Sequence, residues 1–141
     1  MELKLYSYLR NMGLTNEVVD FREKNWQEKL EAYDKTLGLD NDILSNIKKQ
    51  LKTYNAFLKS EQKAEVTLRY YQILSLYFSA LYFKKRKDRD FIFSQDSLAY
   101  WMATGSGKTI IMHLNILQYL EECKKFKDFE IIMTTPGVNL I

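Results

Sequence analysis

The stretch Ala103-Thr104-Gly105-Ser106-Gly107-Lys108-Thr109 decides the predicted fold of this chain. An apolar, β-prone run at residues 98–102 precedes it, and an apolar run with helical spacing at residues 110–120 follows it. A glycine-rich loop between a strand and a helix is the typical context of a phosphate-binding loop. The sequence therefore predicts a strand, a phosphate-binding loop and a helix, rather than a Gly-Ser turn followed by a chance Lys-Thr.

The chemistry of this loop follows from its residue types. Gly105 and Gly107 can adopt positive φ, so that successive backbone N–H groups turn inward toward phosphate oxygens. The following helix adds its unpaired N–H groups and the positive end of its dipole. We expect Lys108 to reach the β- and γ-phosphates and Thr109 to offer its hydroxyl to Mg²⁺, which makes these two the expected catalytic residues. The residues expected to bind the cofactor in this loop are Thr104, Gly105, Ser106, Gly107, Lys108 and Thr109.

Composition sets broad limits on the protein. The 141 residues are 46% hydrophobic, which suits one domain with a sizeable core, and the formal net charge of +3 neither demands nor excludes nucleic acid. A single cysteine, Cys123, rules out an internal disulfide and fits a reducing compartment. The longest apolar-rich run, at residues 70–83, is shorter than the about 18 residues of a membrane span. We therefore expect a cytoplasmic protein with no membrane partner.

The first part of the chain is predicted to be helical. One apolar stripe consists of Trp26, Leu30, Tyr33 and Leu37, and Gly38 after it suits a helix C-terminus. Residues 40–42 offer an N-cap for a second helix, whose stripe is Ile43, Ile47, Leu51, Tyr54 and Leu58. The two helices are predicted to pack on each other as an antiparallel pair, and a partner-binding or DNA-guiding surface is the alternative.

The rest of the chain completes an α/β prediction. An aromatic-rich helix is expected at residues 68–83, followed by a charged connector at 84–90 that is predicted to be a solvated loop, with a phosphate-backbone contact as the alternative. The run at 130–135, ended by Pro136-Gly137, is predicted to be a second buried strand. Helices that alternate with buried strands indicate a parallel sheet.

Two further segments resemble a known family. Leu68-Arg69-Tyr70-Tyr71-Gln72 lies upstream of the loop, and together they resemble superfamily 2 helicases and translocases, in which an L-R-x-Y-Q element recognises adenine through its glutamine. That resemblance maps adenine recognition onto Gln72, whose amide can accept from adenine N6 and donate to N7. Residues 131–141 resemble the strand and turn that commonly meet the nucleic-acid backbone in this family. The sequence of residues 101–109 resembles most closely that of the motor subunits of type III and type I restriction enzymes, in the DEAD/DEAH-box group.

The resemblance covers residues 66–141 and implies ATP and Mg²⁺ as cofactors. It also implies double-stranded DNA as a partner of the parent protein, with a methyltransferase or specificity subunit as a possible further one. The resemblance does not cover the first part of the chain, which the apolar spacing predicts to be a helical region at 1–62; at 63–141 the resemblance implies the incomplete start of a RecA-like phosphate-loop sheet domain. Met102 departs from the pattern, because it stands where the general loop starts with glycine.

A larger departure is the lack of an acidic pair of the Asp-Glu-x-His or Asp-Glu-x-Asp type, which ATP hydrolysis needs to hold Mg²⁺ and orient water. We therefore expect an N-terminal piece of a larger DNA motor, which binds nucleotide weakly and does not turn it over by itself. Two alternatives stay open. Another phosphate-loop enzyme, such as a small kinase, is one, and a non-enzymatic helical interaction module with a remnant loop is the other.

Overall fold

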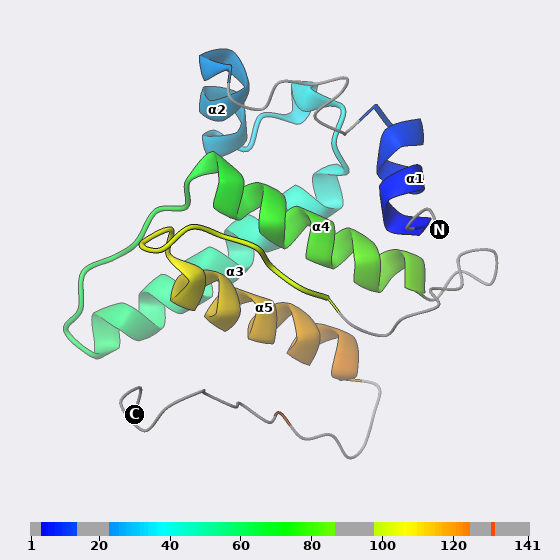
Figure 1. The fold of residues 1–141 in the computed structure, drawn as a ribbon. Coiled ribbons are helices and arrows are strands. Elements are labelled where there is room, and N and C mark those ends of the chain that lie inside the picture. Colours follow the sequence, from blue (N-terminus) through cyan, green and yellow to red (C-terminus); the bar gives the residue numbers. More distant parts are fainter. Residues whose placement is uncertain (1–3, 14–22, 87–97, 125–130, 132–141) are drawn as a thin grey trace.

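The computed structural model describes residues 4–13, 23–86, 98–124 and 131. Within these ranges the chain forms five α-helices and one short 3₁₀ helix (Figure 1). They are α1 (Lys4–Asn11), α2 (Lys24–Glu31), η1 (Lys35–Leu37), α3 (Asn41–Ser60), α4 (Tyr70–Arg86) and α5 (Lys108–Cys123). No helix among the described residues is long and apolar enough to cross a membrane.

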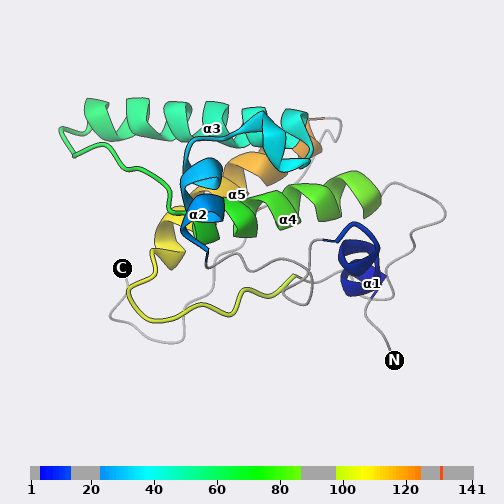
Figure 2. The same ribbon diagram turned by 90° about the horizontal axis from the view of Figure 1, so that it is seen from above.

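Helix α4 lies at the centre of the arrangement. It packs against α2, α3 and α5, and α3 also packs against α5. Figures 1 and 2 together show α3 on one side of α4 and α5, and the extended segment at 98–103 on the other. The buried core runs through these helices and includes Leu30, Leu39, Ile43, Leu44, Ile47, Leu68, Ile73, Leu74, Leu76, Tyr77, Leu81, Ile111 and Leu114. The first turn of α5 is thereby fixed against the first turn of α4.

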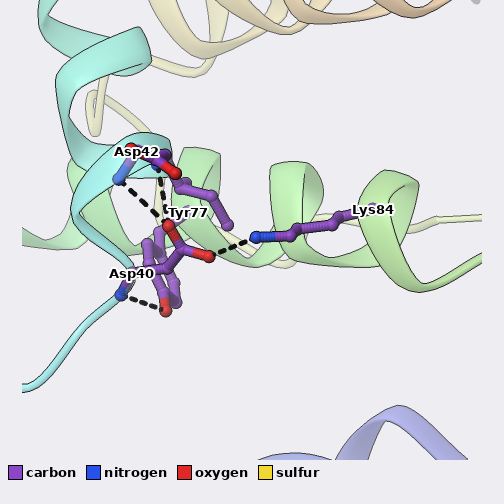
Figure 3. Close-up of polar contacts among 5 residues, drawn as sticks. Asp40, Asp42, Tyr77 and Lys84 are labelled. Atoms are coloured by element: carbon purple, nitrogen blue, oxygen red, sulfur yellow. Dashed lines mark hydrogen bonds and ion pairs between the residues drawn. The ribbon is translucent and has the colours of Figure 1, made fainter.

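The predicted N-cap of α3 is confirmed. The Asp40 carboxylate accepts hydrogen bonds from the backbone N–H groups of Asp42, at 3.0 Å, and Ile43, at 3.3 Å. The same carboxylate pairs with Lys84 on α4 at 2.6 Å, and the Asp40 N–H donates to the Tyr77 hydroxyl at 3.0 Å (Figure 3). A capping residue satisfies helix N–H groups that have no partner within the helix. Here it also ties the start of α3 to the buried face of α4.

The helix predicted from Trp26 to Leu37 is shorter in the structure. α2 ends at Glu31, and Tyr33 adopts a positive φ of 56°. Asp34 then starts η1 by accepting from the Thr36 N–H at 2.8 Å, and Gly38 closes it at φ 72°. The antiparallel pairing of the first two helices was wrong, because α2 packs chiefly on α4.

The predicted α/β class is contradicted, because the described residues form helices and no strand. The run at 98–102 is extended, but a strand is defined by a ladder of backbone hydrogen bonds to a partner strand. The Tyr100 hydroxyl instead hydrogen-bonds the Ser79 hydroxyl of α4. The second predicted strand, at 130–135, lies outside the described residues except for Ile131, which has no regular structure. The boundary between regions 1–62 and 63–141 stays a prediction.

Candidate functional site

The glycine-rich stretch forms a tight loop at the N-terminus of α5. Gly105 and Gly107 have φ values of 78° and 80°, as predicted for a loop that turns its backbone inward. The Ser106 N–H donates to the Ala103 carbonyl at 3.2 Å, and Gly107 is the N-cap residue of α5. The first N–H groups of any helix have no partner within it, so those of α5 face the side from which the loop enters. This arrangement is suited to an anion.

Gln72, in the first turn of α4, lies directly against this loop. Its side chain is buried, with Nε2 donating to the Ser106 carbonyl at 2.9 Å and Oε1 accepting from the Arg69 N–H at 2.9 Å. A Cβ added to Gly107 would lie 2.4 Å from Gln72 Nε2, whereas one added to Gly105 would meet nothing within 4 Å. Glycine at 107 is therefore needed both for its backbone angle and for the close approach of Gln72.

Lys108 points back toward the loop that precedes it. Its Nζ donates to the carbonyl oxygens of Met102, at 3.0 Å, and Ala103, at 2.8 Å. The side chain is exposed, and an ammonium carries three donors, so one remains free of these two bonds. To bind β- and γ-phosphates with all its donors, Lys108 would have to leave the two carbonyl groups.

The three hydroxyl residues of the loop differ in their surroundings. Thr104 and Thr109 are exposed, while the Ser106 Oγ is buried and has no hydrogen-bond partner in the described part of the chain. A cavity of about 340 Å³ adjoins Thr109 and Lys108 and is otherwise lined by Tyr100, Met102 and residues of α5. No group of three or more His, Cys, Asp or Glu residues that could hold a metal ion occurs among the described residues. Thr109 as a Mg²⁺ ligand stays a prediction.

The observed geometry fits a phosphate group. Two left-handed glycines, an exposed lysine and the N-terminus of a 16-residue helix lie within one short loop. The buried hydroxyl of Ser106 in the same loop has no hydrogen-bond partner in the described part of the chain, and a phosphate oxygen could accept a hydrogen bond from it. Of the predicted site residues, the structure brings Gln72 into direct contact with the loop at Ser106. Recognition of adenine by Gln72 is not tested by this contact.

Sequence reasoning missed the carbonyl groups that hold these side chains in place. The oxygens of Met102, Ala103 and Ser106 are the acceptors for Lys108 and Gln72, and a backbone group leaves no sign in residue identity. It also missed Tyr100, which precedes the loop in the sequence and whose hydroxyl contacts that of Ser79 on α4. Burial raises the pKa of Tyr100, and the hydrogen bond with Ser79 lowers it by less. Tyr100 is 39% exposed and Trp101 is fully exposed, so the run at 98–102 offers no buried–exposed alternation that could have singled out Tyr100.

Comparison with known proteins gives one match. A family model described as type III restriction enzyme, res subunit, matches residues 44–140, which is more than half of the chain. The matched range begins in α3 and includes both Gln72 and the loop. A search of curated proteins and a search of solved structures each found no match.

Proposed function

The chain belongs to the family of type III restriction enzyme res subunits, and from this premise we propose that it binds ATP as part of a helicase-type motor of a restriction system. Phosphates would lie at the N-terminus of α5, against Gly105, Gly107 and Lys108. Thr104 and Ser106 would offer further hydroxyl or backbone groups, and Thr109 would bind Mg²⁺. The bound Mg²⁺ would neutralise phosphate charge.

One observation carries this proposal. Gln72 and Ser106 are 34 residues apart in the sequence, yet their hydrogen bond joins the start of α4 to the glycine-rich loop. A glutamine beside this loop would put an amide that can read a base and a backbone that can hold phosphates on one side of the molecule. The Gln72 amide still has a second N–H and a second acceptor lone pair, since each of its two groups makes one bond here. These groups could contact adenine only once the Gln72 side chain, which is 4% exposed, becomes accessible.

DNA is the proposed polymer partner. The family relation supports it, and α3 carries an exposed row of lysines, Lys48, Lys49, Lys52 and Lys59. Positions 48, 52 and 59 lie on one side of a helix because four and seven residues complete nearly whole turns. A methyltransferase or specificity subunit is the proposed protein partner, on the family relation alone.

Calorimetric titration of the 141-residue chain with Mg²⁺–ATP tests the nucleotide proposal. We expect saturable binding that Lys108→Ala weakens by roughly tenfold or more, because a hydrogen bond to a charged group is lost. Lys124→Ala, at the other end of the same helix, is the matched control and should bind as the wild type does. A folded chain without measurable ATP binding, or equal affinities for the two alanine variants, would contradict the proposal.

Two further measurements test Mg²⁺ binding and ATP hydrolysis separately from ATP binding. Thr109→Ala should remove the gain in affinity that Mg²⁺ gives to ATP, while Thr53→Ala on α3 should retain it. Hydrolysis is measured separately with and without duplex DNA. Because the sequence has no acidic pair of the motor type, we expect no meaningful turnover. Robust DNA-stimulated hydrolysis that Lys108→Ala abolishes would overturn that expectation and leave the binding proposal standing.

A further inference from the structure

A hollow of about 710 Å³ lies along the exposed face of α3. It is lined by Glu65, from the segment after the helix, and by the lysine row of α3, which consists of Lys48, Lys49, Lys52 and Lys59. The opposite face of α3 carries Ile43 and Ile47, which are buried in the core, so the lysine row points away from α4 and α5. Figure 2 shows the extended segment that leads into the glycine-rich loop on the far side of α4 and α5. The hollow is therefore separate from the proposed nucleotide site.

The positive charge of the lysine row has no compensating carboxylate on its own helix. No acidic residue occurs from position 43 to position 60, and among the described residues Glu65 is the single carboxylate in the lining of the hollow. None of the four lysines forms an ion pair within the described part of the chain, and Lys48 Nζ lies 5.5 Å from the centroid of the Tyr33 ring. Like charges three or four positions apart on a helix repel one another, as those of Lys49 and Lys52 do. A polyanion laid along the row would relieve this repulsion.

Hydrogen bonds hold the segment that carries Glu65 against α3. The side-chain amide of Asn55 donates to the Val66 carbonyl at 2.9 Å and accepts from the Val66 N–H at 3.0 Å. The Lys63 N–H also donates to the Leu58 carbonyl of α3, at 2.8 Å. The hollow is therefore formed before a ligand arrives, and a preformed site binds its ligand with less loss of conformational entropy.

The composition of the lining indicates a phosphate backbone rather than a protein or a membrane. Lysine is depleted in protein–protein interfaces, whose binding energy comes mainly from tryptophan, tyrosine and arginine, and the lining has none of these three among the described residues. A helix that lies on a membrane needs a free apolar face, whereas that of α3 is buried against α4 and α5. Lysine contacts phosphates as a point charge, and such contacts read no base. Lys48 and Lys59 are eleven positions apart, about 17 Å along the helix axis, which matches the rise of about five phosphates along one DNA strand.

We propose that the lysine row and its hollow hold the phosphate backbone of duplex DNA without regard to base sequence. The choice of DNA among polyanions rests on the proposed function, whereas the place and the manner of binding rest on the geometry of α3. Because the row lies on another side of the molecule from the glycine-rich loop, DNA held there leaves the loop free for ATP.

Fluorescence anisotropy of a labelled duplex of about 20 base pairs, titrated with the whole chain at several salt concentrations, tests the proposal. The logarithm of the binding constant should fall linearly with the logarithm of the salt concentration, and each lysine–phosphate contact contributes about 0.9 to the slope. The triple variant with glutamine at positions 48, 52 and 59 should bind roughly tenfold or more weakly near 0.1 M salt, with a slope smaller by about 2.7. The matched control is the triple variant with glutamine in place of Lys24, Lys35 and Lys124, which has the same net charge and should keep the wild-type slope. Two duplexes of unrelated sequence should bind with equal affinity.

Equal affinities and slopes in the two triple variants would overturn the proposal, because overall charge alone would then explain the binding. A wild-type chain that binds no duplex DNA would overturn it as well, while saturable binding of Mg²⁺–ATP in the same sample would leave the nucleotide proposal standing. Tighter binding to a polyglutamate peptide or to phosphatidylserine vesicles than to the duplex would assign the row to a protein or a membrane surface instead.

Arginine at positions 48, 52 and 59 keeps the charge and should keep the wild-type slope, and a loss as large as that of the glutamine variant would show that charge is not the cause. If circular dichroism shows that the glutamine variant does not fold, Lys52→Glu replaces it, with Lys35→Glu as its control. Equal DNA binding by these two single variants would also overturn the proposal.

Discussion

The side-chain amide of Gln72 donates to the Ser106 carbonyl at 2.9 Å and fills the space in which a side chain at position 107 would lie. The loop and the first turn of α4 are therefore one structural unit. Any group larger than hydrogen at position 107 must displace Gln72 and break its bond to Ser106. This relationship can be tested through stability, without any nucleotide.

We predict that Gly107→Ala destabilises the protein more than Gly38→Ala does. Both glycines have positive φ, 80° and 72°, so each substitution carries a backbone cost of about 1–2 kcal/mol. A Cβ at position 38 meets nothing within 4 Å, while one at 107 lies 2.4 Å from Gln72 Nε2. The extra loss is about 1 kcal/mol, the worth of one hydrogen bond. Denaturant unfolding measures both values.

A double-mutant cycle identifies the cause. In a Gln72→Ala background the clash is gone, so Gly107→Ala should then cost no more than Gly38→Ala does. An extra loss that persists in this background would show that Gln72 is not its source.

The second prediction concerns the choice of base. If Gln72 reads adenine, Gln72→Leu should bind ATP roughly tenfold or more weakly and lose its preference for ATP over GTP, because a bidentate amide contact is worth about 1–3 kcal/mol. Competition between the two nucleotides measures the preference. Gln50→Leu, a second buried amide remote from the loop, is the control and should leave the preference intact. If Gln72→Leu kept its preference for ATP over GTP, residues other than Gln72 would have to recognise the base.

The third prediction concerns the junction of α3 and α4. Tyr77 is fully buried, and its hydroxyl accepts from the Asp40 N–H. Tyr77→Phe keeps the ring but leaves this partly buried N–H without its acceptor, which costs about 1–3 kcal/mol. Tyr71→Phe removes a hydroxyl from an exposed side chain of the same helix and should change the free energy of unfolding very little. Equal effects of the two changes would contradict the proposed role of the Tyr77 hydroxyl.

Local signals predicted the helices well. The apolar stripe from Ile43 to Leu58, with an acidic cap before it, gave α3 and its N-cap at Asp40. The two glycines gave the left-handed positions of the loop. These features depend on residues close in sequence, and the physical rules that govern them act over a few positions.

Features that depend on distant partners were not predictable. The run at 98–102 has strand-forming composition, but propensity describes fit to a sheet and does not create a neighbouring strand. In the structure its Tyr100 contacts Ser79 of α4 instead. Gln72 and the loop were each recognised, while the bond between Gln72 Nε2 and the Ser106 carbonyl depends on how α4 and α5 pack. α2 likewise ends at Glu31 although the apolar spacing continues to Leu37, because Tyr33 adopts a positive φ and Asp34 starts η1.

The last prediction concerns pH. Burial by itself would raise the pKa of Asp40, but the hydrogen bond from Lys84 and those from the Ile43 and Asp42 N–H groups outweigh it, so the pKa lies below its ordinary value. In the unfolded chain an aspartate has a pKa of about 3.9. A carboxylate whose pKa is lower in the folded state stabilises the protein fully above the unfolded pKa. That stabilisation is lost as the pH falls through the folded value.

We therefore predict that the stability advantage of the wild type over Asp40→Asn is present at pH 7 and disappears on acidification below about pH 4. The advantage is roughly 0.5–1 kcal/mol, because asparagine still caps a helix and the Lys84 side chain is 56% exposed, which weakens the ion pair. Denaturant unfolding at pH values from about 2 to about 7 measures the difference in the free energy of unfolding between the wild type and Asp40→Asn. Asp42→Asn removes a carboxylate from the same turn without removing the cap. Its effect should contain the charge attraction between Asp42 and Lys84 but not the contribution of the Lys84–Asp40 hydrogen bond. That contribution is isolated by repeating both substitutions in a Lys84→Met background, where the advantage over Asp40→Asn should shrink. An advantage that is unchanged at pH 2, or unchanged without Lys84, would show that the Asp40 carboxylate does not stabilise the α3–α4 junction through its charge.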